Sequence, residues 1–249
     1  MTTQEKNGIT EGVIWKQLLI FFFPILVGSF FQQLYNTVDS VIVGQFVGKE
    51  ALSSVGGSAG QIISLVVGFF TGVSTGATVI ISQYFGAGKK EEIEESLHTA
   101  YAFALVGGLV LGIAGIVFAP QMLLWMNTPE ELIAESVLYV RVYFSGLIFI
   151  FIYNMGAAIL RAVGDSKRPL YYLIVCSVVN IILDLLLILV IPLGVLGAAI
   201  ATLIAQAVSA VLVTVTLMYR GGHETVSLTD PHVQKNAAEY FKNRSSGGI

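Results

Sequence analysis

Apolar stretches of about 20 residues recur along this chain, and short clusters of charged residues separate them. A stretch of that length crosses the hydrocarbon core of a bilayer as one helix. Only 12% of the residues are charged and 55% are hydrophobic, whereas a soluble domain has about 25% charged residues. The pattern therefore predicts an all-α membrane protein that crosses the bilayer several times.

Six transmembrane helices follow from these stretches. We expect them at residues 16–44, 54–85, 96–119, 132–160, 170–191 and 197–219. The chain then divides into a polar cytoplasmic N-terminus (1–15), a six-span unit (16–219) and a polar tail (220–249). The tail lacks apolar periodicity, which predicts disorder or weak helix. Its two histidines, His223 and His232, have no further ligands near them in the sequence and do not indicate a metal site.

Basic residues are distributed unevenly among the predicted loops. If the N-terminus is cytoplasmic, eleven of the 13 Lys and Arg residues fall on that side, and only Lys49 and Arg141 lie outside or near the outer surface. Lys and Arg concentrate in cytoplasmic loops. We therefore expect both termini in the cytoplasm, in a multi-pass protein of the plasma (inner) membrane.

Two carboxylates, Asp39 and Asp184, lie well inside predicted spans. A charge at mid-membrane costs roughly 2.5–3.5 kcal/mol on insertion scales, so each needs a partner, a proton or a water-filled cavity. At a rise of about 1.5 Å per residue, Asp184 lies roughly 12 Å below the outer end of its span and Asp39 roughly 8–13 Å. Thr202 lies roughly 12 Å below the outer end of its own span. The three side chains are thus predicted at one level.

Asn180 stands one helical turn before Asp184, on the same helix face. Two carboxylates, an amide oxygen and a hydroxyl suit a hard cation such as Na⁺, or a proton shared between two acids. Simpler roles stay open for three of them. Asp39 would be a solvated residue at the end of its span, Asn180 an interhelical hydrogen-bonding group, and Thr202 a partner of its own helix backbone. Asp184 is the hardest of the four to explain without a site.

The first span carries further polar residues and a proline. Pro24 removes a backbone donor and is expected to kink the helix, either for packing or to shape a transport site. Gln32, Gln33, Tyr35 and Asn36 follow it and cover more than one helix face. We take Pro24, Gln32, Tyr35 and Asn36 as candidate cavity-lining residues.

Small residues inside the spans give weaker indications. Gly72 with Gly76, and Gly108 with Gly112, form GxxxG pairs that allow close helix approach. The one cysteine, Cys176, lies in an apolar stretch and is interpreted as a core residue.

Four stretches resemble the multidrug and toxic compound extrusion (MATE) family of cation-coupled transporters: NTVDSVIVGQFVGKEALSSVG (36–56), ISQYFGAGKKEE (81–92), ILRAVGDSKRPL (159–170) and NIILDLLLI (180–188). The resemblance covers residues 10–220 and implies the N-terminal six-helix lobe of a family built from two such lobes. It implies an antiporter that exports small amphipathic or cationic organic compounds, coupled to Na⁺ or H⁺ and using no other cofactor. By resemblance, Asp39, Asn180, Asp184 and Thr202 form the cation or proton site, and Tyr35 and Asn154 belong to the same cavity.

Other functions are weighed by the motifs that they require. No P-loop, zinc-ligand spacing, nucleophile elbow or dinucleotide fingerprint is present in the sequence, so an enzyme is not expected. A flippase for lipid-linked precursors is one alternative, but it should carry Arg or Lys toward its cavity, and the spans hold no basic cluster. The other alternative is a non-transporting lobe that binds or regulates a partner.

The expected partners follow from the need for two lobes. Alternating access uses two helical bundles that move about a central site. We therefore expect a small organic substrate, the lipid bilayer, and a second copy or a complementary lobe as partners, and no nucleic acid.

Overall fold

The computed structural model describes residues 14–223, and these residues form eight α-helices and two π-helical segments. In chain order the elements are α1 (Ile14–Ile42), η1 (Val43–Val47), α2 (Lys49–Gly56), α3 (Ser58–Gly86), α4 (Lys90–Trp125), α5 (Glu130–Ser145), α6 (Leu147–Ala162), α7 (Lys167–Asp184), η2 (Leu185–Val190) and α8 (Gly194–His223). Most of the predicted polar N-terminus and tail, at 1–13 and 224–249, lies outside the described residues.

The predicted all-α architecture with six spans is confirmed. Five segments of the described chain are long and apolar enough to cross a membrane, and α5 with α6 supplies a sixth if this pair, bent by 48°, counts as one span. Some helices extend beyond the predicted spans: α8 continues to His223, although the polar tail was predicted to begin at residue 220. Backbone hydrogen bonding does not depend on side-chain hydropathy, so a helix can continue past its apolar part.

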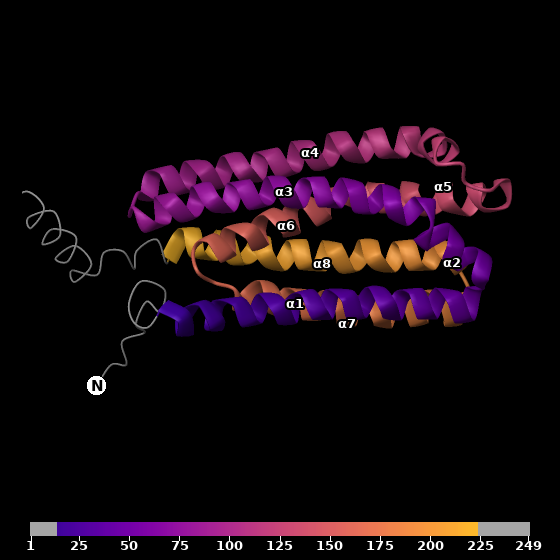
Figure 1. Ribbon diagram of the computed structural model, residues 1–249, viewed down its shortest axis with the longest axis horizontal. Helices are drawn as coiled ribbons and strands as arrows, with labels where there is room; N and C mark the ends of the chain where they lie inside the picture. Colours follow the sequence, from indigo (N-terminus) through magenta and orange to yellow (C-terminus); the bar gives the residue numbers. More distant parts are fainter. Residues whose placement is uncertain (1–13, 224–249) are drawn as a thin grey trace, which may run out of the picture.

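The helices lie roughly parallel in three layers, which Figure 1 shows as α3 with α4, α6 with α8, and α1 with α7. Helix α8 occupies the middle of the bundle and packs against α5, α6 and α7. The outer faces carry large exposed apolar side chains, such as Leu65, Phe69 and Trp125. Such a surface is suited to contact with lipid.

The breaks in the described helices lie away from Pro24, where the sequence predicted a kink. Helix α1 is continuous through Pro24 from Ile14 to Ile42. Instead, the π-helical segment η1 follows α1, η2 follows α7, and the bend between α5 and α6 falls at Gly146. π-Helical turns occur frequently at functional sites. Here η2 begins directly after Asp184.

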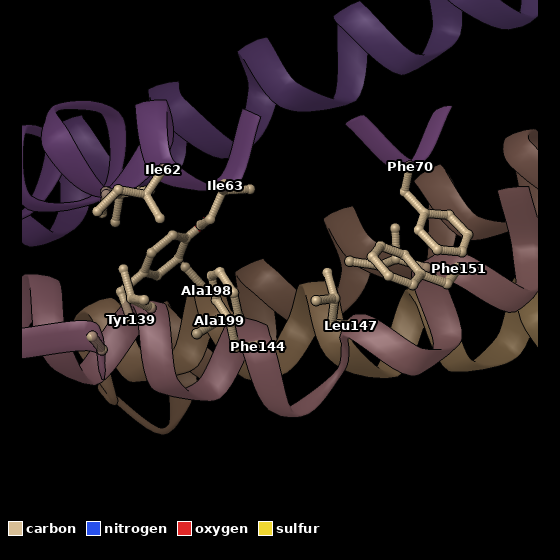
Figure 2. Close-up of a cluster of buried hydrophobic side chains, with 14 of the residues drawn as sticks. Ile62, Ile63, Phe70, Tyr139, Phe144, Leu147, Phe151, Ala198 and Ala199 are labelled. Atoms are coloured by element: carbon tan, nitrogen blue, oxygen red, sulfur yellow. The ribbon is translucent and has the colours of Figure 1, made fainter. Parts of the chain in front are cut away.

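Aromatic rings fill the core between α3 and α6. Phe70 of α3 stacks on Phe151 of α6 with ring centroids 3.4 Å apart, and Phe103 of α4 stacks on Phe70 at 5.8 Å. Figure 2 shows Phe70 against Phe151, with Leu147 nearby. Cys176 of α7 is buried, as predicted for a core residue.

Glycines in α4 allow this helix to approach the bent pair closely. A Cβ added at Gly108 would lie 2.8 Å from the Cα of Ile148, and one at Gly112 would lie 2.9 Å from the carbonyl oxygen of Phe144. At Gly72 and Gly76 of α3 a Cβ would meet no atom within 4 Å. The GxxxG prediction is therefore confirmed for α4 and wrong for α3 within the described bundle.

Replacing Gly115 by alanine is expected to destabilise the bundle. A Cβ at this position would overlap the buried ring of Phe144, which must move away. Overpacking of this kind costs about 1–3 kcal/mol. Thermal unfolding in detergent should show a lower midpoint for Gly115→Ala, whereas the matched change Gly72→Ala, which faces open space, should leave it nearly unchanged. Equal midpoints for the two variants would contradict this packing.

Candidate cation site

The two carboxylates inside the spans face each other. Asp39 lies in the last turn of α1 and Asp184 is the last residue of α7, and these two helices pack side by side. Their carboxyl groups are close enough for each to influence the ionisation of the other. The depth estimate made from the sequence predicted one level for the two aspartates, and their helices lie side by side.

Three of the four carboxyl oxygens of this pair have no hydrogen-bond donor within residues 14–223. Asp184 is 0% exposed, yet neither of its carboxyl oxygens has a hydrogen-bond partner, and Oδ1 of Asp39 has none. Ionised carboxylates only accept hydrogen bonds, so the two groups cannot satisfy each other unless a proton or a cation lies between them. An unpaired buried charge costs several kcal/mol, which makes the pair a strong site for positive charge.

Asn180 and Thr202 extend the site from α7 to α8. The Nδ2 of Asn180 donates a hydrogen bond of 3.4 Å to Oγ1 of Thr202, and both side chains are buried. This hydrogen bond leaves Oδ1 of Asn180 without a partner. Seven buried side-chain oxygens in residues 14–223 have no partner, and four of them belong to Asp39, Asn180 and Asp184.

Three tyrosines lie near enough to influence the carboxylates electrostatically. The buried Tyr139 of α5 is close enough to interact electrostatically with both Asp39 and Asp184, and Tyr35 and Tyr143 interact with Asp39. Tyr35 was predicted by resemblance, whereas Tyr139 and Tyr143 were missed. Their spacing of four residues on one face of a predicted span was the available signal.

Among the described residues, no basic side chain forms an ion pair with either carboxylate. The ion pairs found in the described residues are Lys89 with Glu92 and Arg168 with Asp165, both near the ends of helices. The same residues hold no group of three or more His, Cys, Asp and Glu side chains that could bind a metal ion. The chemistry of the site is therefore that of oxygen ligands and two carboxylates, which suits a proton or a hard monovalent cation.

The other candidate cavity-lining residues differ in burial and position. Gln32 and Asn36 are exposed on the surface of α1, and Pro24 is buried. Asn154 lines a different cavity with Arg161, and its Nδ2 donates to the carbonyl oxygen of Ile150 at 2.8 Å. Asn154 lies eight residues after the bend at Gly146, which is roughly 12 Å further along α6.

Comparison with known proteins identifies what this arrangement resembles. The family model described as MatE matches residues 24–186. Two proteins of Bacillus subtilis (strain 168) are each 32% identical to this chain. "Probable multidrug resistance protein YoeA" matches 88% of this chain and 48% of its own length. "Probable multidrug resistance protein YpnP" matches 91% of this chain and 50% of its own length.

Solved structures show the same helical arrangement. One is described as "Outward-facing conformation of a multidrug resistance MATE family transporter of the MOP superfamily", with a TM-score of 0.80 and 26% identity over 87% of this chain and 48% of that chain. Another, "Crystal structure of MATE in complex with MaD3S", has a TM-score of 0.79 and 27% identity over 85% of this chain and 48% of that chain. The chain spans about half the length of these relatives.

Proposed function

Because this chain belongs to the MatE family of multidrug transporters, we propose that it forms the cation-coupled N-terminal lobe of an exporter of small organic compounds. One observation carries the coupling role. Asp39, Asn180 and Asp184 bring together four buried oxygens that have no hydrogen-bond partner among the described residues. Such a set binds positive charge, and Na⁺ and H⁺ are the two candidates.

Coupling follows from the charge of the pair. A bound proton neutralises one of the two carboxylates, and a bound Na⁺ acts as a counter-ion to both. In either case the net negative charge of the site falls. A positively charged or amphipathic substrate near the site is then attracted less. Binding of the two species is therefore antagonistic, and this coupling is reciprocal. An inward flow of the small cation can in this way drive release of the substrate.

The orientation that we propose puts both termini in the cytoplasm of a plasma (inner) membrane protein. At one end of the bundle α3 and α6 end and α4 and α7 begin, and the basic residues Lys89, Arg161, Lys167 and Arg168 lie at that end. We call it the basic end. Lys49 lies at the opposite end, where η1 leads into α2. The bias of Lys and Arg toward cytoplasmic loops supports this direction.

A second lobe is the partner that we propose for transport. Gln32, Gln33 and Asn36 are exposed on α1. Uncharged polar side chains are poorly accommodated by lipid tails, because lipid offers them no hydrogen bonds. This face of α1 therefore suits a water-filled path shared with another helical bundle, which a second copy or a complementary lobe would supply.

A flippase for lipid-linked precursors is the second candidate. One observation favours it: Arg161 lines a cavity between α1, α3 and α6. A single guanidinium at the basic end is less than the cluster expected for an anionic head group.

Binding of the coupling cation to the purified protein tests the proposal. We expect saturable ²²Na⁺ binding, or release of protons when NaCl is added, measured with a pH indicator in weakly buffered detergent solution. The double variant Asp39→Asn with Asp184→Asn is the blank, since it keeps the shape of the site and removes its charge. Identical traces for the unmodified protein and the blank would overturn the coupling role.

A further inference from the structure

A second cavity lies apart from the carboxylate pair, toward the basic end of the bundle. It encloses about 220 Å³ between α1, α3 and α6. Its lining combines apolar side chains from α1 with polar side chains from α3 and α6: Phe21, Ile25, Thr71, Ser74, Thr75, Thr78, Asn154, Ala158 and Arg161. No carboxylate lines it.

The guanidinium of Arg161 is the charged group of this cavity. Arg161 is half-buried near the end of α6, and it makes no ion pair with any side chain in residues 14–223. The ionisable neighbour with which it interacts is Tyr153, whose hydroxyl donates to the carbonyl oxygen of Pro169 at 3.2 Å. An arginine that is partly removed from water without a counter-ion favours an anion beside it.

Ser74 is an independent indication that the cavity takes a ligand. Its side chain is 3% exposed, lines the cavity, and its hydroxyl has no hydrogen-bond partner. The neighbouring threonines differ, because Thr71, Thr75 and Thr78 each donate to a carbonyl oxygen of their own helix. The free donors of the cavity are therefore Arg161, Ser74 and the second N–H of Asn154.

We propose that this cavity binds a phosphate group through the guanidinium of Arg161 and the hydroxyl of Ser74. Arginine presents parallel N–H donors that match two oxygens of a phosphate, and a hydroxyl donor can contact a third. The threonine hydroxyl oxygens can accept from donors elsewhere on the same head group. Phe21 and Ile25 add apolar contacts for a hydrocarbon part, as an anionic phospholipid would supply.

The site is distinct from the cation pair. Helix α7 extends roughly 26 Å from Lys167, at the basic end, to Asp184. Neither Asp39 nor Asp184 lines the second cavity. Binding of phosphate can therefore be tested whether or not the carboxylate pair couples transport to a cation.

Native mass spectrometry of the purified chain with phosphatidylglycerol tests the proposal. Arg161→Gln is expected to weaken phosphatidylglycerol binding by about 10-fold or more, since a charge-assisted double hydrogen bond is lost. Arg168→Gln is the matched control. Arg168 lies at the same end but already pairs with Asp165 at 3.5 Å and is exposed, so binding should change less than about twofold. Equal losses in the two variants, or no loss in either, would overturn the site.

Competition with inorganic phosphate shows whether the bound phosphate group belongs to a free anion or to a lipid head group. Displacement of phosphatidylglycerol by millimolar phosphate would show that the cavity accepts the free anion. Binding that persists in phosphate but is weak for phosphatidylcholine would assign it to an anionic lipid head group. Ser74→Ala provides a second variant if Arg161→Gln does not fold. It should weaken binding severalfold, and unchanged binding in Ser74→Ala would contradict the proposal.

Discussion

Replacing Asp184 by asparagine is expected to abolish cation or proton binding and, with it, coupled export. The carboxyl group of Asp184 is fully buried, and both of its oxygens lack donors within the described residues. Asparagine keeps the size of the side chain but removes the charge, and it directs an N–H₂ group where a cation would lie. We expect binding to weaken by more than about 100-fold, because a buried ionic interaction is lost. Equilibrium ²²Na⁺ binding and proton release measure this directly.

Thermal stability separates this role from a structural one. Asp184 accepts no hydrogen bond in the described bundle, so Asp184→Asn removes none and eliminates a buried charge. The unfolding midpoint should therefore stay the same or rise. Glu135→Gln on the exposed face of α5 is the matched control and should change neither property. Unchanged ion binding in Asp184→Asn would contradict the assignment of Asp184 to the cation site. A large fall in the unfolding midpoint would favour a structural role.

Asp39→Asn should weaken binding less and change the competition between Na⁺ and protons. Asp39 is half-buried, and only its Oδ1 lacks a partner, so it contributes less to the site than Asp184. We expect about a 10-fold loss of Na⁺ affinity, the size of one charge interaction in a partly solvated place. When Asp39 is neutral, Asp184 no longer shares its proton with a second acid. When ²²Na⁺ binding is measured across a pH series, the pH dependence of binding by Asp39→Asn should therefore be displaced from that of the unmodified protein.

Two outcomes for Asp39→Asn would contradict this role of Asp39. A profile that overlays that of the unmodified protein, at equal affinity, would mean that Asp39 is a solvated residue at the end of α1. Loss as complete as that of Asp184→Asn would mean instead that the two carboxylates act only as a unit. Glu135→Gln again serves as the control for the removal of a helix carboxylate.

The level of the site could be predicted because the spans are regular and their ends are marked. Gly44 to Gly48 and Pro192 to Gly194 end two spans, and a constant rise per residue places Asp39, Asp184 and Thr202 at one depth. The helices that carry the two aspartates are uninterrupted up to these residues, which is the regularity that the estimate assumes. The hydrogen bond from Asn180 to Thr202 could not be derived, because depth does not give the rotation of a helix.

The residues that the sequence placed wrongly or missed owe their positions to the packing of neighbouring helices. Tyr139 and Tyr143 resemble ordinary aromatic residues of a span, and only the packing of α5 brings them to Asp39. Asn154 was grouped with the cation site, yet the bent pair carries it to another cavity. Hydropathy alone does not distinguish a straight span from one that is bent at Gly146.

The burial of Cys176 makes the protein convenient for chemical labelling. It is the single cysteine of the chain, and its position inside the bundle shields the sulfur from reagents in water. A cysteine introduced at an exposed position, such as Gln33 of α1, would then be the preferred site for a maleimide or a spin label. Distances between such probes could be followed without first removing a native thiol.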